Sequence, residues 1–263
     1  MRIGREVIDS PLTRRDPSVK LVLLFVVSLA VSFVLDPATA AVLWVLAMIA
    51  VLVGARMPLG ALIRGQWPFA LFGLGIFVVN TLSRPGEVLW QAGWLRVTVE
   101  GLEVGGALAL RALTIGVLAL GFLVSTAPVP LLTSARDVLR LPPTVAYAVL
   151  AGYRMLQDLP REWDLLRAAH AVRDPGDGPV RLRVRTAPSV VFGLLVVSIR
   201  RAERIAQSLE TRGLGLRPRT TWHPARVTSA DAMLAAGTLA VLAGVVALSV
   251  RLGWWTGPGA LTG

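Results

Sequence analysis

The side chains best placed to make specific polar contacts are two arginines, each of which closes a long helical pattern. Arg173 precedes Asp174, and Arg212 precedes Gly213. A cation in the last turn of a helix complements the helix dipole and contributes about 0.3–1 kcal/mol. The planar guanidinium can also bind carboxylates or carbonyls of another protein. Either arginine alone favours the helix cap, whereas the repeat of this ending on two helices suggests a partner contact.

Groups that carry catalysis or bind metals are scarce. The chain has no cysteine, which excludes disulfides, thiolate nucleophiles and cysteine metal sites. His170 and His223 are far apart and have no metal-binding neighbour at the usual spacing, so we interpret them as surface or loop residues. The apolar stretches carry no paired carboxylates and no Asp-rich motif. The sequence therefore predicts no catalytic residues, no metal site and no cofactor.

The composition indicates a membrane protein. The 263 residues are 54% hydrophobic and 16% charged, whereas soluble domains average about 45–50% and about 25%. A spanning helix needs about 20 apolar residues. Buried helices of a soluble protein are the alternative, but they would need more polar covering than the chain offers. We expect five spans, of which the first is extended by Lys20 snorkelling to the interface. The apolar stretches are 21–35, 38–54, 67–82, 105–125 and 230–250.

The basic residues predict the topology. The formal net charge is +11, and arginine and lysine concentrate on the cytoplasmic side of bacterial membranes. They are dense before the first stretch and throughout 126–229. We therefore expect an all-α protein of the bacterial cytoplasmic (inner) membrane, with the N-terminus inside and the C-terminus outside. Nucleic-acid binding is not expected, because stacking aromatics do not interleave with the basic residues.

Two features of the N-terminal membrane region, 1–125, each allow more than one interpretation of the local structure. Arg111 lies about two turns into the fourth stretch. A cation at that depth either packs against the bundle or a partner within the membrane, or snorkels to the outer interface. Residues 97–105 alternate somewhat like a strand, but they run straight into a span. We interpret them as an interfacial start of the fourth helix, and residues 58–64 as a short interfacial helix.

The region 126–229 is predicted to be a cytoplasmic domain, followed by a last span and tail in 230–263. Its periodicity indicates a short helix at 131–141 and two long amphipathic helices at 144–173 and 188–212. Pro160 should kink the first long helix without ending it. The alternative, that both long helices span the membrane, is disfavoured because a charge at the bilayer centre costs about 2.5–3.5 kcal/mol. Residues 190–199 are apolar enough for partial membrane burial.

These features together resemble one family, the transmembrane T component of energy-coupling-factor (ECF) ABC importers, which includes cobalt- and biotin-transporter subunits. Each matching motif is short, but their order extends over most of the chain. The matching residues are Ser10-Pro11-Leu12, Asp16-Pro17, Lys20, Glu100-Gly101-Leu102, Ala109-Leu110-Arg111, Ser125-Thr126-Ala127-Pro128, Arg154, Leu159-Pro160, Glu162 and Ser208-Leu209-Glu210-Thr211-Arg212-Gly213.

The resemblance implies a non-catalytic coupling subunit. Its two long cytoplasmic helices would cross and dock onto two ABC-type ATPases, with Arg173 at one tip and Arg212 with Gly213 at the other. The flanking Val172 and Asp174 depart from the family's small residues, as does Thr211 from its alanine. Pro160, Glu162 and Glu210 would support the coupling helices.

The resemblance also implies a separate substrate-binding (S) membrane subunit that takes up a vitamin or transition-metal ion. This chain therefore need not encode the substrate. Two other functions stay open at this stage: a membrane-embedded enzyme acting on lipid or isoprenoid substrates, and a classical ABC permease.

Overall fold

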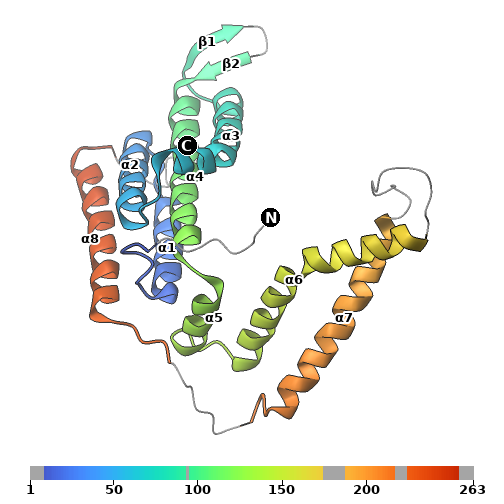
Figure 1. Ribbon diagram of the computed structural model, residues 1–263. Coiled ribbons are helices and arrows are strands. Elements are labelled where there is room, and N and C mark those ends of the chain that lie inside the picture. The colour runs from blue at the N-terminus through green and yellow to red at the C-terminus, as the bar shows by residue number, and fades with distance from the viewer. Residues whose placement is uncertain (1–8, 93–94, 174–186, 217–223, 255–263) are drawn as a thin grey trace. The chain divides into compact units, whose positions relative to one another are not determined.

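The computed structural model describes residues 9–92, 95–173, 187–216 and 224–254, which form two compact units. The described residues up to 131 and from 226 onward make one unit, called here the bundle unit. Residues between 132 and 225 make the other, the helix-pair unit. Helices dominate both units (Figure 1). The predicted all-α fold class is confirmed.

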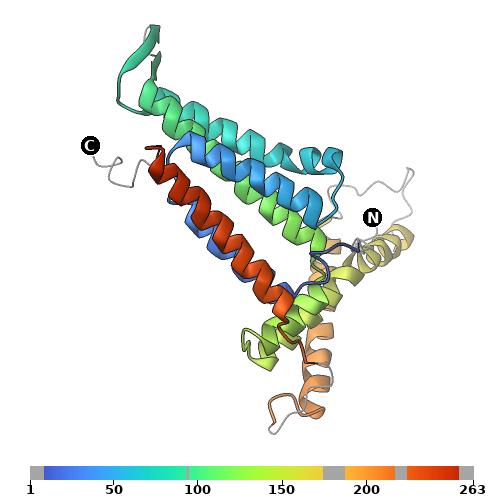
Figure 2. The same ribbon diagram turned by 90° about the vertical axis from the view of Figure 1, so that its left-hand side faces the viewer.

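The bundle unit holds the apolar helices. Four of them are long and apolar enough to cross a membrane, and α1 is a shorter apolar helix. In the bundle α4 packs against both α2 and α3 (Figures 1 and 2). The orientation of the termini stays a prediction. The helices are α1 Pro17–Val31, α2 Pro37–Gly54, α3 Leu59–Ser83, α4 Val99–Ser125 and α8 Ser229–Arg251.

Two Asp-Pro pairs determine where the first two helices begin. The Asp16 carboxylate accepts a hydrogen bond from the Ser18 amide at 2.9 Å, and the Asp36 carboxylate accepts one from the Thr39 amide at 2.7 Å. In each case proline takes the first helical position, where its missing N–H is not needed. These pairs are therefore helix starts as well as turns.

Close backbone approach joins α3 to α4. A Cβ added at Gly105 would lie 3.0 Å from the Phe77 carbonyl oxygen, and one added at Gly73 would lie 3.3 Å from the Ala109 carbonyl oxygen. Small residues permit such contacts between membrane helices, where packing and hydrogen bonds drive association. Leu62, Val51 and Val117 form the buried core beside this contact. The helix expected at 58–64 is continuous with α3, which passes through Pro68 without a break.

A β-hairpin separates α3 from α4, so the expected start of the fourth helix is confirmed for residues 99–105, and residues 97 and 98 belong to a strand. Strands β1 Val88–Ala92 and β2 Leu95–Thr98 pair antiparallel, and α4 begins only at Val99. The Thr98 hydroxyl then caps α4 by accepting a bond from the Gly101 amide at 3.1 Å. The alternation at the start of this segment was thus a real strand signal, which needed a partner strand to be recognised.

Polar contacts near both ends attach α8 to the bundle. Asp231 accepts bonds from the Asp16 amide at 3.0 Å, the Thr228 amide at 2.8 Å and the Thr228 hydroxyl at 2.6 Å. Near the other end, the Thr39 hydroxyl donates to Ser249 at 2.5 Å. Asp231, Thr39 and Ser249 are buried.

The helix-pair unit contains two long helices after a short one. The chain enters it through α5, Pro128–Asp137, which begins and ends earlier than the predicted 131–141. Helices α6, Pro143–Arg173, and α7, Ala187–Thr211, match the predicted helices to within one residue at each end. Pro160 lies inside α6, and Figure 1 shows that helix bent partway along its length. His170 is half-buried in α6, and His223 lies outside the described residues.

We predict that Asp231→Ala destabilises the bundle unit, because it leaves the buried amide of Asp16 without its acceptor. An unsatisfied buried group costs about 1–3 kcal/mol, and each kcal/mol corresponds to about 2–4 °C in a chain of this size. The thermal unfolding midpoint of detergent-purified protein measures this loss. Asp164→Ala, which removes an exposed carboxylate of α6, should leave the midpoint unchanged. An equal midpoint in both variants would contradict the assignment.

Candidate functional site

Helices α6 and α7 run antiparallel. Leu166 of α6 lies near Gly193 of α7, at 3.6 Å from a Cβ built on that glycine. Further along, Arg201 meets Asp158 and Glu162. From the first contact to the second, the residue numbers decrease along α6 and increase along α7. The C-terminus of each helix therefore lies beside the N-terminus of the other.

Arg201 joins the two helices at the kinked part of α6. It forms an ion pair with Asp158, and its Nη1 lies 3.4 Å from the Glu162 carboxylate. The two carboxylates are four residues apart, on one face of α6, and Pro160 lies between them. All three side chains are partly exposed, so each pair contributes about 0–1 kcal/mol. The cluster therefore determines register more than stability. Glu162 thus contacts the second long helix, and the supporting role of Glu162 and Pro160 stays a prediction.

A second polar cluster anchors the short helix α5. Arg136 Nε donates to Asp137 at 2.7 Å, and its Nη1 donates to the Tyr147 hydroxyl of α6 at 3.0 Å. The other Asp137 oxygen accepts a bond from the Ala225 amide at 2.9 Å. The hydrogen bond from Arg136 holds the pKa of Asp137 below its usual value. Sequence reasoning missed this cluster, because Ala225 carries no side-chain signal.

The end of α7 follows a defined capping geometry around Arg212. The Gly213 amide bonds the Glu210 carbonyl at 2.9 Å, and the Leu214 amide bonds the Leu209 carbonyl at 2.9 Å. This pair of bonds is the Schellman motif, whose residue after the cap adopts positive φ. Gly213 has φ +81°. Glycine is therefore required there by geometry, and it leaves the Arg212 side chain exposed where the helix ends.

The two candidate tips lie far apart. Arg173 is the last residue of α6, and its side chain is outside the part of the structure described. Because the helices are antiparallel, Arg173 and Arg212 lie at opposite ends of the pair. A helix rises about 1.5 Å per residue, so the 31 residues of α6 place the two tips about 40 Å apart. The structure thus presents two separate ends rather than one site.

A groove between α6 and α7 lies toward the Arg212 end. It encloses about 300 Å³ and is lined by small residues such as Ala148, Gly152 and Ala206. Glu210 also lines it, and its side chain is exposed. The predicted residue Glu210 therefore contributes its backbone carbonyl to the helix end and its side chain to the groove.

Two basic residues of the bundle turn inward. Lys20 does not snorkel as predicted: its side chain is buried, and its Nζ donates to the Ser125 carbonyl at 2.8 Å. Arg111 is half-buried and donates to the Ser32 carbonyl at 2.7 Å, at the C-terminal end of α1. That position complements the negative end of the helix dipole. Arg111 thus makes a hydrogen bond within the chain, and its placement relative to the membrane interface stays a prediction.

Comparison with known proteins identifies the family. The profile of the CbiQ family, described as cobalt transport protein, matches residues 9–222. The chain belongs to the CbiQ family. This is a family of transporter components rather than of enzymes, which disfavours the membrane-embedded enzyme considered above.

Curated relatives of this CbiQ-family member agree. All three described here are named energy-coupling factor transporter transmembrane protein. The one from Thermosediminibacter oceani is 29% identical over 89% of this chain and 92% of its own length. The one from Bacillus subtilis is 28% identical over 81% of this chain and 84% of its own length. The one from Heliobacterium modesticaldum is 27% identical over 78% of this chain and 80% of its own length. The chain is thus a transmembrane component of a bacterial energy-coupling-factor transporter.

We predict that Arg201→Glu loosens the helix pair, because it places a third negative charge beside Asp158 and Glu162. The chain lacks cysteine, so spin labels can be attached at Val149→Cys and Leu195→Cys, both exposed in the parent chain. Pulsed electron paramagnetic resonance should give a broader distribution of distances between the two spin labels in the Arg201→Glu variant than in the parent.

The exchange variant Arg201→Glu/Asp158→Arg should narrow that distribution again. Arg200→Glu is the matched control, because Arg200 is exposed and adjacent. A distribution that broadens equally in the Arg200 variant would show that the ion-pair cluster does not set the register.

Proposed function

We propose that this chain is the non-catalytic coupling subunit of an ECF-type ABC importer, in which its two helix ends contact two ABC-type ATPases. The observation that carries the proposal is the antiparallel pairing of α6 and α7, which separates Arg173 from Arg212 by about 40 Å. One ATPase occupies each end, and ATP hydrolysis takes place in those partners. The family match and the names of the relatives support this assignment.

The contacts at the tips must change with the nucleotide state. A partner shifts a conformational equilibrium only by the difference in its affinity for the two conformations. An exposed guanidinium suits this task, because its fork binds carboxylates or backbone carbonyls in defined directions. When the ATPases close, the tips move with them, and the cluster around Arg201 keeps α6 and α7 moving together.

Motion reaches the membrane helices through two chain connections. The first is α5, which continues from α4, and the second is the segment that leads from Ala225 into α8. Asp137 hydrogen-bonds to the Ala225 amide, so the two connections are joined within the helix-pair unit. A displacement of α5 is thereby transmitted to the start of α8 as well as to the end of α4.

A separate substrate-binding membrane subunit then reorients and releases its vitamin or transition-metal ion into the cell. The N-terminus and the helix-pair unit lie on the cytoplasmic side, and the C-terminus lies outside. The concentration of arginine in 126–229 supports this orientation. A classical ABC permease has no separate substrate-binding membrane subunit. Co-purification of a small substrate-binding subunit therefore distinguishes an ECF-type importer from a classical permease.

We predict that Arg212→Glu reduces substrate uptake at least tenfold, either through weaker ATPase assembly or through ATP hydrolysis that no longer drives transport. Pull-down of the ATPases, ATP turnover and uptake in proteoliposomes separate these two outcomes. Arg204→Glu, on an exposed position within α7, is the matched control. Normal assembly and uptake in the Arg212 variant would count against the tip contact.

We also predict that Gly213→Ala weakens assembly with Arg212 intact. A side chain at φ +81° costs about 1–2 kcal/mol and disturbs the helix end that presents Arg212. Binding of the ATPases should fall severalfold by surface plasmon resonance. Gly215 also has positive φ but lies beyond the two capping bonds, so Gly215→Ala separates a general backbone effect from loss of the helix end. Equal losses in both variants would contradict the prediction.

A further inference from the structure

A cleft separates the middle of α8 from the rest of the bundle unit. It encloses about 430 Å³ and is lined by α1, α2, α4 and α8, through side chains such as Val31, Leu43, Leu118 and Leu242. The hydrogen bonds of Asp231 and Ser249 lie near the two ends of α8. Between these bonds Leu242 and Val245 pack against the buried core, and the cleft lies along residues 233–242 of α8.

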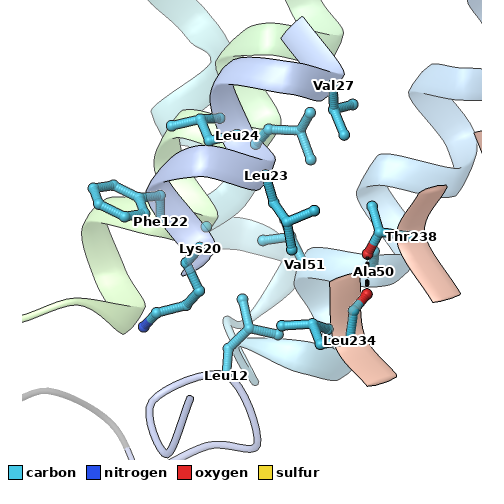
Figure 3. A pocket seen from close by; sticks show the side chains of 12 residues that line it. Leu12, Lys20, Leu23, Leu24, Val27, Ala50, Val51, Phe122, Leu234 and Thr238 are labelled. Carbon is cyan, nitrogen blue, oxygen red and sulfur yellow. Dashed lines mark hydrogen bonds between the residues drawn. The ribbon is translucent and has the colours of Figure 1, made fainter. Parts of the chain in front are cut away.

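The lining offers few polar groups to a ligand. Among the described residues that line the cleft, Thr114 and Thr238 carry the hydroxyl groups. Each hydroxyl donates to its own helix, to the carbonyls of Leu110 and Leu234 respectively, both at 2.8 Å. Figure 3 shows the second of these bonds. A buried water needs about three hydrogen bonds, and this surface does not supply them. The occupant must be apolar.

The cleft opens sideways along one edge of α8. Met233, Gly237 and Val241 recur every four residues and line the cleft, which places them on one face of the helix. Met233 is 75% exposed and Val241 is 53% exposed. A Cβ added at Gly237 meets nothing within 4 Å. Because α8 is a membrane-spanning candidate, this opening faces the hydrocarbon of the bilayer.

The volume of the cleft fits a long hydrocarbon chain. An engineered apolar cavity of about 150 Å³ holds one benzene molecule, so 430 Å³ corresponds to about three such groups, or about 18 carbon atoms. A second cavity of about 140 Å³ shares Val27, Ala50, Leu118, Leu234 and Thr238 with the first and extends it toward Lys20. In Figure 3 the Lys20 ammonium points away from Leu234 and Thr238 of α8, so the extension also presents an apolar surface.

We propose that the cleft binds one acyl chain of a membrane phospholipid. The volume, the apolar lining, hydroxyls that donate to their own helices and an opening along a spanning helix together favour a hydrocarbon chain, and bilayer lipid is its source. The bound chain supplies α8 with the dispersion contacts that neighbouring side chains do not make. The ATPase contacts proposed above play no part in this inference.

The test uses the full chain with its partner subunits, reconstituted in vesicles that contain phosphatidylglycerol with a diazirine near the end of one acyl chain. After illumination, mass spectrometry locates the labelled peptides. Labelling should concentrate at Met233 and at the facing residues of α1 and α2. Gly237→Leu fills the cleft and should reduce labelling there at least fivefold.

Gly244→Leu is the matched control. Gly244 lies on the same helix, is exposed, and also has open space around its Cβ position, so this variant should label like the parent. Unchanged labelling in Gly237→Leu, or uniform labelling along α8, would overturn the proposal.

A protein occupant gives a different result. In the cysteine-free chain, Met233→Cys provides a single attachment point for a bifunctional crosslinker. Crosslinking to another subunit or to a second copy, together with absent lipid labelling, would show that protein covers the cleft and would overturn the proposal. Thermal midpoints close to that of the parent confirm that the variants are folded before these outcomes are compared.

Discussion

The carboxylate of Asp231 holds together parts of the bundle that apolar packing alone leaves loosely joined. In hydrocarbon, one apolar surface gains little by exchanging lipid for another helix, so hydrogen bonds and close packing decide which helices associate. Asp231 binds the amide ahead of α1 and caps α8 at the same time. The position of α8 depends on this contact, on the hydroxyl pair at Ser249 and on the packing of Leu242 and Val245 against the buried core.

In the helix-pair unit, too, a few polar contacts join the helices. Arg201 fixes α7 against α6 through Asp158 and Glu162, and Asp137 fixes the segment at Ala225 against α5. A few polar contacts set the register of these long helices. This arrangement fits the proposed role of transmitting motion between partner subunits.

Several features of the fold and site could be predicted because their causes are local. Apolar stretches of spanning length, the kink at Pro160 and the glycine after Arg212 each depend on residues within about two turns. For that reason the boundaries of α6 and α7 agree with prediction to within one residue at each end. The family assignment likewise follows from short motifs whose order extends along the chain, and the matched profile confirms it.

By itself, then, the sequence determined the helices, the ends of α6 and α7, and the family. The tertiary structure decided which groups form hydrogen bonds with each other. The bond from Lys20 to Ser125 joins residues 105 positions apart, that from Asp16 to Asp231 joins residues 215 apart, and the bond between Asp137 and Ala225 has a backbone donor without any side-chain signature. The strand at Leu95–Thr98 became visible only with its partner strand. The physical reason is that a side chain's burial and its hydrogen-bond partner depend on segments distant along the chain, which local periodicity does not encode.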